Sequence, residues 1–248
     1  MVRGRRVCAA SIIAAAFTVV WGWVPGGFAE ADEEETRTLI FSGRDIWRNG
    51  AFAYGGLLIA PGGFEQDGLM LKLLLSTGAY RYYAQNLGLE VIGVEAKAHL
   101  MPGWRIKRGN AEFKFFFGPE YQRHYLWPAD PDNRLRGASF GLRFSAELWY
   151  EPTRQTLIAG DVSLSSIATS HSARLAFGWL TFGELIEAFY IGPEMQYYGS
   201  DGYRQLRFGA HITSMKTDEV EWSAGIGWSA ASDGRASPYM RIGLMKRR

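Results

Sequence analysis

Apolar and polar residues alternate along most of the chain, and residues 111–122 show the pattern most clearly. Successive side chains of a strand point to opposite faces, so this stretch predicts a strand with two different faces. The apolar face carries Ala111, Phe113, Phe115, Phe117, Pro119 and Tyr121. The mostly polar face carries Glu112, Lys114, Phe116, Gly118, Glu120 and Gln122. The first face suits lipid and the second suits a wet interior.

The same alternation recurs in about twelve segments of about 9–13 residues, long enough to cross a bilayer at a tilt. They begin near residues 39, 52, 69, 92, 111, 140, 158, 173, 190, 206, 220 and 239. Turns are predicted at Asn49-Gly50, Pro102-Gly103, 151–154 and 199–202, and a loop at 126–133. An even count of strands is typical of bacterial outer-membrane barrels. The sequence therefore predicts an all-β, closed antiparallel transmembrane β-barrel of about twelve strands, with ten as the alternative count.

Alternation alone does not say which face is wet, since a soluble lipocalin-like barrel has the same period with its apolar face inward. Three features favour the membrane barrel. Aromatic residues gather near strand ends, the polar face is rich in glycine, serine and opposite charges, and several short turns alternate with longer loops. We therefore expect outer-membrane lipid around the barrel and an outer-membrane location.

The N-terminus has the features of a cleaved signal peptide over residues 1–31: three arginines, an apolar run over 7–24 and small residues near 27–31. Residues 32–38 form an acidic leader, and the barrel domain is expected over 39–248. Cleavage removes three of the 27 basic residues, one of the 25 acidic residues and the single cysteine. The mature chain is then neutral, which gives no reason to expect a nucleic-acid partner.

The motif Gly-Pro-Glu-x-Gln occurs at 118–122 and again at 192–196. Proline lacks a backbone donor, so both copies predict a bulge or bend in their strands. Alternation turns seven polar side chains toward the lumen: Glu120, Gln122, Arg143, Glu147, Glu194, Gln196 and Arg207. One interpretation is structural, with each glutamate paired to an arginine of a neighbouring strand. The other is a polar path for a sugar, with Trp149 and Tyr190 as stacking platforms.

Nothing in the sequence predicts an enzyme. His171-Ser172 is the one adjacent histidine–serine pair, and neighbours on a strand point in opposite directions, so the two do not form a catalytic dyad. We find no metal-ligand spacing and no phosphate-binding loop, so neither a metal nor another cofactor is expected.

Four stretches resemble the cellulose biosynthesis protein BcsS family of alphaproteobacteria. They are residues 41–56 (FSGRDIWRNGAFAYGG), 102–108 (PGWRIKR), 117–120 (FGPE) and 201–210 (DGYRQLRFGA). The resemblance implies an accessory, non-catalytic role in cellulose or related exopolysaccharide biosynthesis or secretion. It also implies a partner in the cellulose synthase or secretion complex, or the polysaccharide itself. The alternative is a small-solute or oligosaccharide channel of the outer membrane.

Overall fold

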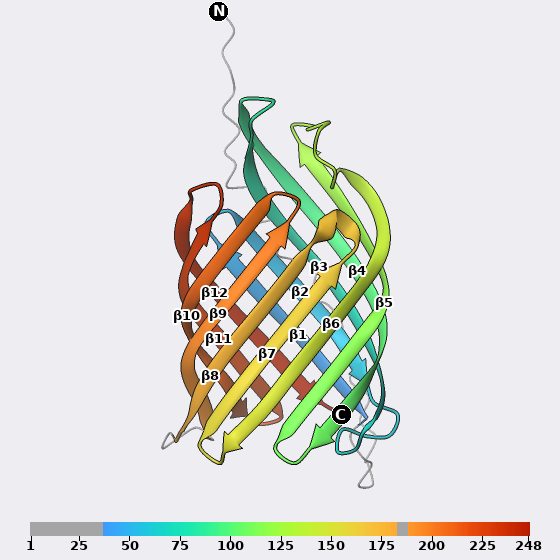
Figure 1. Ribbon diagram of the computed structural model, residues 1–248, viewed down its shortest axis with the longest axis vertical. Coiled ribbons are helices and arrows are strands. Elements are labelled where there is room, and N and C mark those ends of the chain that lie inside the picture. The colour runs from blue at the N-terminus through green and yellow to red at the C-terminus, as the bar shows by residue number, and fades with distance from the viewer. Residues whose placement is uncertain (1–36, 183–187) are drawn as a thin grey trace, which may run out of the picture. The chain divides into compact units, whose positions relative to one another are not determined.

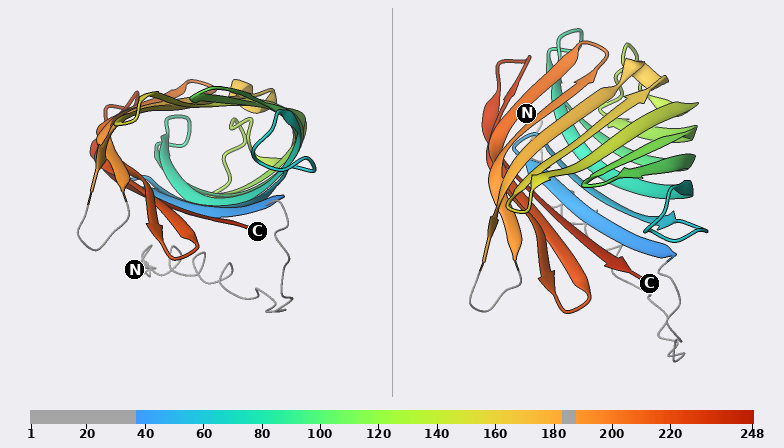
Figure 2. Two further views of the ribbon diagram at one scale, coloured as in Figure 1. Left: turned by 90° about the horizontal axis from the view of Figure 1, so that it is seen from below. Right: turned by 60° about the horizontal axis from the view of Figure 1, so that its bottom comes forward.

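The computed structural model describes residues 37–182 and 188–248, which form a closed antiparallel barrel (Figure 1). Its strands are β1 (Thr38–Trp47), β2 (Gly50–Ile59), β3 (Gly68–Ala84), β4 (Leu89–Arg108), β5 (Ala111–Trp127), β6 (Gly137–Thr153), β7 (Thr156–Ser165), β8 (His171–Thr181), β9 (Phe189–Ser200), β10 (Tyr203–Thr217), β11 (Val220–Ala231) and β12 (Ala236–Arg247). Each strand pairs with the next, and β12 pairs with β1 to close the ring (Figure 2). The predicted fold and the count of twelve are confirmed. The signal peptide and residues 32–36 of the leader lie outside the described residues.

The apolar face of the strands points outward, as a lipid-facing belt requires. Phe117 is 55% exposed, Leu142 50% and Phe208 55%, whereas the intervening Phe116 is 1% exposed. Phe113 and Phe115 are exposed too. A lipocalin-like arrangement would bury these side chains in a dry core, so the soluble alternative is wrong. No helix in the described part of the chain has the length and apolarity to cross a membrane.

Strands β3 to β6 are longer than predicted, at 17, 20, 17 and 17 residues. The predicted turn at Pro102-Gly103 is wrong, because both residues lie inside β4, and the chain turns at Gly109 and Asn110. Likewise, the predicted loop at 126–133 begins later, since β5 continues to Trp127. The extra length projects beyond the other strands, at the end of the barrel away from the C-terminus (Figure 1).

Of the bulge or bend predicted at the two Gly-Pro pairs, the bulge is wrong, because the register shifts at neither pair. His99 faces Glu120 and Gly103 faces Phe116, so the register of β4 and β5 does not shift across Gly118-Pro119. Pairing is interrupted there instead, because proline has no N–H to give to the ladder. A side chain at Gly118 would lie 2.2 Å from the Leu100 carbonyl oxygen. The glycine therefore allows a close approach of two backbones, and the register shifts occur in β6 and β10.

Both ends of the barrel chain lie at one rim, which we call the terminal rim, since the Thr38 N–H donates to the Arg248 carbonyl at 2.9 Å. The connection between β2 and β3, residues 60–67, crosses this rim and buries Phe64. Lys107 fixes the connection by donating from its side chain to Glu65 at 2.7 Å and from its backbone to Asp67 at 2.6 Å. These hydrogen bonds lower the pKa of both carboxyl groups.

Candidate functional site in the barrel lumen

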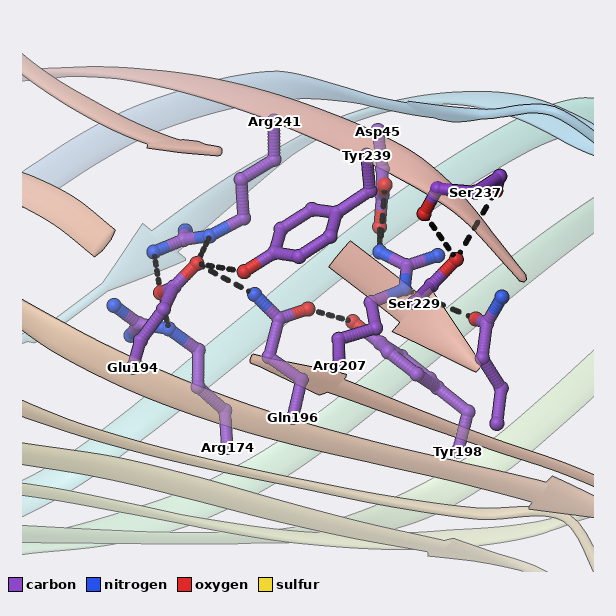
Figure 3. A network of polar contacts seen from close by, with 11 residues as sticks. Asp45, Arg174, Glu194, Gln196, Tyr198, Arg207, Ser229, Ser237, Tyr239 and Arg241 are labelled. Atoms are coloured by element: carbon purple, nitrogen blue, oxygen red, sulfur yellow. Dashed lines mark hydrogen bonds and ion pairs between the residues drawn. The ribbon is translucent and has the colours of Figure 1, made fainter. Parts of the chain in front are cut away.

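One polar network in the lumen is centred on Glu194 of β9, whose side chain is completely buried (Figure 3). Arg241 of β12 donates from Nη2 at 2.6 Å and from Nε at 3.1 Å, and Arg174 of β8 donates from Nε at 3.0 Å. The Tyr239 hydroxyl and the Gln196 amide complete the set at 3.0 and 2.8 Å. One carboxylate therefore accepts five hydrogen bonds, three of them from guanidinium groups. We call these residues the Glu194 cluster.

Arg207 of β10 extends this network toward β1. Its Nη1 donates to both carboxylate oxygens of Asp45 at 2.8 Å. Its guanidinium carbon lies 4.6 Å from the ring centre of Trp47 and 4.8 Å from that of Tyr198. The Tyr198 hydroxyl donates to Gln196 at 2.9 Å, so Tyr198 connects the Arg207–Asp45 ion pair to the Glu194 cluster. Contacts with aromatic faces suit the planar, weakly hydrated arginine cation.

The other copy of the motif, at 118–122, has its own centre at Glu120 of β5, also completely buried. Arg143 of β6 donates to it at 2.8 and 3.2 Å, Gln122 donates at 2.6 Å, and the Ser165 hydroxyl donates as well. His99 Nε2 lies 3.5 Å from the same carboxylate without hydrogen-bond geometry. The Ser165 hydroxyl thus donates to Glu120, and His99 makes no hydrogen bond to Ser165.

A third group links β3 to β5 and β6. Lys72 Nζ lies 2.5 Å from Glu147, and Lys114 Nζ lies 2.6 Å from Glu112 and 3.9 Å from Glu147. Lys72 also lies 5.0 Å from the centre of the Phe116 ring. Opposite charges thus continue along the lumen from the motif residues toward the terminal rim.

Trp149 and Tyr190, the suggested stacking platforms, contact each other. Their ring centres are 6.3 Å apart and nearly perpendicular, and both pack against the buried Leu157 and Ala159. Tyr190 is 7% exposed, and the Trp149 indole N–H donates to Glu151 at 2.8 Å. In this arrangement the two rings cover each other and leave no parallel faces between which a sugar could lie.

All seven polar residues selected from the sequence lie in these groups, and each motif glutamate has an arginine of a neighbouring strand among its partners. Glu120 pairs with an arginine of the following strand, whereas Glu194 pairs with Arg174 of the preceding strand and with Arg241. Sequence reasoning did not select Asp45, Arg174, Arg241 or Ser165. Alternation places each on the same face as its partners, and this was the signal that could have found them.

The chemistry of these groups is charge neutralisation in a space closed to lipid. Serine–histidine–acid geometry is absent from the described strands around Glu120, where serine donates to the acid. Within residues 37–182 and 188–248, no three histidine, cysteine or acidic side chains are placed to hold a metal ion. His171 donates from Nδ1 to the Thr169 carbonyl oxygen at 2.9 Å and has Tyr197 beside it, on the face opposite Ser172.

Comparison with known proteins points to one family and one fold. The family model described as cellulose biosynthesis protein BcsS matches residues 39–248. The COG4313 outer membrane channel from Pseudomonas putida F1 superimposes with a TM-score of 0.52 at 12% identity, over 91% of this chain and 100% of that chain. The beta domain of the Bordetella autotransporter BrkA gives 0.49 at 12% identity, over 87% and 100%. The KdgM porin gives 0.42 at 13% identity, over 84% and 98%. No curated protein matches the chain. The superposition on the COG4313 channel agrees with a closed barrel fold of the outer-membrane type.

Proposed function

The chain belongs to the cellulose biosynthesis protein BcsS family, and on that premise we propose that it is a non-catalytic outer-membrane accessory protein of cellulose biosynthesis or secretion. In this proposal the barrel is a rigid scaffold for the secretion machinery or an anchor for the surface polymer. Its lumen is closed by side chains and does not serve as an open path for solutes.

One observation carries the proposal: ion pairs join strands that are not neighbours in the ring. Lys72 of β3 reaches Glu147 of β6, Arg207 of β10 reaches Asp45 of β1, and Arg241 of β12 reaches Glu194 of β9. Each pair spans three steps around a ring of twelve strands and so runs through the lumen. A twelve-stranded barrel is already narrower than porins of 16–18 strands, and these ion pairs across the lumen narrow its opening further.

The proposed non-catalytic role is supported by how the polar groups are used. Each buried carboxylate of the two motif copies is occupied by arginine, amide and hydroxyl donors, which leaves no free base for a substrate. A catalytic base must have its lone pairs available to the proton that it removes. The same occupancy supports a structural role for Glu120 and Glu194.

Strands β3 to β6 supply a surface for the proposed partner. They project beyond the rest of the ring and form a wall on one side of the barrel (Figure 1). Aromatic residues lie on this wall, including Tyr125 at 57% and Trp127 at 73% exposure. Aromatic side chains with a polar tip are typical of protein and sugar contacts. A component of the cellulose synthase or secretion complex, or the polymer itself, is the partner we propose there.

The second candidate function, a small-solute or oligosaccharide channel, rests on the charged and polar lumen. The two functions are separated by measuring ion current and exported cellulose on the same protein. We expect the purified wild-type barrel to give no steady conductance in planar bilayers, and deletion of the gene to reduce exported cellulose. Complementation with the wild-type gene should restore cellulose. Steady current from the wild type, with unchanged cellulose after deletion, would refute the accessory role and support the channel.

A further inference from the structure

A cavity of about 180 Å³ opens at the terminal rim, next to the Lys114–Glu112 pair of the third group. Its charged lining consists of Arg105, Lys107, Lys114, Arg247, Glu65 and Glu112, from β4, β5, β12 and the connection between β2 and β3. Four cations therefore face two carboxylates around one small space. The apolar residues Leu39, Leu58 and Phe64 close the remainder of its wall.

The excess positive charge can be assigned to two of the four cations. Lys107 lies 2.7 Å from Glu65 and Lys114 lies 2.6 Å from Glu112, so these two pairs are neutral. In the two ranges that the structure describes, no carboxylate lies within ion-pair distance of Arg105 or Arg247. Arg247 is exposed and its charge is hydrated, whereas Arg105 is only 2% exposed.

Arg105 is therefore the unusual residue of this cavity. Its Nε and Nη2 atoms are buried and have no hydrogen-bond partner among the described residues. These two atoms form one edge of the guanidinium group, where two parallel N–H bonds point in the same direction. That edge matches two oxygens of a carboxylate or phosphate group, and such bidentate contacts are the strongest that arginine makes. A buried cation without a hydrogen-bond partner is costly, so an anion that neutralises this guanidinium group stabilises the protein.

The cavity volume limits what can bind. It has room for several water molecules, each of which takes about 30 Å³ in the liquid. It is smaller than the roughly 300–1,000 Å³ typical of sites that enclose a drug-sized ligand. A single carboxylate or phosphate group fits these limits, and a sugar chain does not.

We propose that this cavity is an oxyanion-binding site at the terminal rim, with the guanidinium group of Arg105 as its principal ligand and Arg247 as a second cation. The oxyanion could come from the solution, as phosphate or a small dicarboxylate. It could also come from this chain, because Asp32, Glu33, Glu34 and Glu35 lie just before Thr38 in the sequence. Glu35 is three residues before Thr38, and three residues span at most about 10 Å. Thr38 itself is hydrogen-bonded to Arg248 at this same rim.

The test uses protein purified from outer membranes in detergent, at low ionic strength because salt screens such contacts. Binding of inorganic phosphate and of succinate is measured by calorimetry. Six chains are compared. The first four are wild type, Arg105→Met, a leader variant with Asp32→Asn, Glu33→Gln, Glu34→Gln and Glu35→Gln, and the leader variant that also carries Arg105→Met. Arg105→Lys keeps the charge without the bidentate edge, and Arg235→Met at the opposite rim is the matched control.

We expect Arg105→Met to weaken anion binding at least tenfold in a background where binding occurs, and Arg105→Lys to weaken it nearly as much. Arg235→Met should change it less than twofold. Equal binding by wild type and by the leader variant identifies a diffusible anion as the ligand. Binding that appears only in the leader variant identifies the chain's own acidic segment, which occupies the site in the wild type. Absence of anion binding in both backgrounds, or binding that Arg105→Met leaves unchanged, would overturn the proposal. The outcome is independent of cellulose export and of conductance, so it stands or falls separately from the proposed function.

Discussion

Replacing Glu194 with glutamine removes the charge at the centre of the Glu194 cluster with almost no change of shape. The carboxylate is completely buried between Arg174 and Arg241, so the cluster has one negative and two positive charges. Glu194→Gln leaves the largely buried Arg241 without a carboxylate partner, leaves Arg174 with only the longer pair to Asp161 at 3.8 Å, and replaces charge-assisted hydrogen bonds with neutral ones. Removing one partner of a buried ion pair costs about 3–5 kcal/mol. We expect a loss of that size in the free energy of unfolding.

The measurement is urea unfolding of the barrel in lipid vesicles, followed by the change in gel mobility on heating and by tryptophan fluorescence. Glu90→Gln is the matched control, since Glu90 pairs with Arg235 at 3.1 Å but is half exposed. Exposed pairs of this kind contribute about 0–1 kcal/mol. Adding Arg241→Met to Glu194→Gln should recover part of the loss, because it removes the cation that Glu194→Gln leaves without a carboxylate partner. If Glu194→Gln destabilised the barrel no more than Glu90→Gln, the lumen at Glu194 would be hydrated, and the argument for a closed interior would be wrong.

Three further predictions concern the close strand contacts, the outer face and the connection at the terminal rim. Gly192→Ala places a methyl group 1.9 Å from the Phe177 carbonyl oxygen and should cost at least about 1–3 kcal/mol of unfolding free energy, whereas Gly62→Ala, with open space around it, should cost less than about 0.5 kcal/mol. Phe115→Arg on the outer face should cost about 2–4 kcal/mol in vesicles if its site lies near the bilayer midplane, measured by the same urea titration. The pKa values of Glu65 and Asp67 are lowered from their usual 4.5 and 3.8, so the hydrogen bonds to their carboxylates stabilise the connection fully at any pH above those usual values. This stabilisation is lost as the pH falls through the lowered pKa values. Protease cleavage at residues 60–67 should therefore be unchanged between pH 7 and 5 and should increase below about pH 4, with an acid-stable protease.

Each of these can fail in a specific way. Equal stability of the two glycine variants would mean that the strands separate without cost at the Gly-Pro pairs. A neutral Phe115→Arg would place that side chain outside the hydrocarbon belt. Cleavage that rises already between pH 7 and 5 would show that groups other than these two carboxylates hold the connection.

The fold could be predicted because a period of two is a local signal. Alternation around residues 111–122 and 140–150 identified both faces without knowledge of any partner strand. Pro102-Gly103 was misread because the pair is a strong turn signal when considered alone. In β4 its proline falls where pairing with β5 is interrupted, so the missing N–H costs no ladder bond. The continued alternation from Trp104 to Lys107 was the counter-signal.

The partners within the lumen could not be predicted in the same way, because they depend on closure of the ring. Asp45 and Arg207 are 162 positions apart and meet only because β12 pairs with β1. Glu194 and Arg241 are separated by two strands around the ring, and nothing local distinguishes Arg241 from Arg207 as the partner. Residue types on the polar face are thus readable from sequence, whereas their pairing is a property of the closed cylinder.

Glycines on the inward face explain how so many large polar side chains fit into a narrow cylinder. A side chain at Gly225 would lie 2.4 Å from Glu194 Oε1 and 2.8 Å from Arg241 Nε, and one at Gly209 would lie 2.5 Å from the Tyr239 hydroxyl. These positions must be empty for the Glu194 cluster to form. Glycine is unfavourable in a strand, so its presence here is offset by the ion pairs that it admits. The glycines and the charges of the lumen therefore depend on each other. Glycines on β10 and β11 leave the space that the ion pairs of β8, β9 and β12 fill.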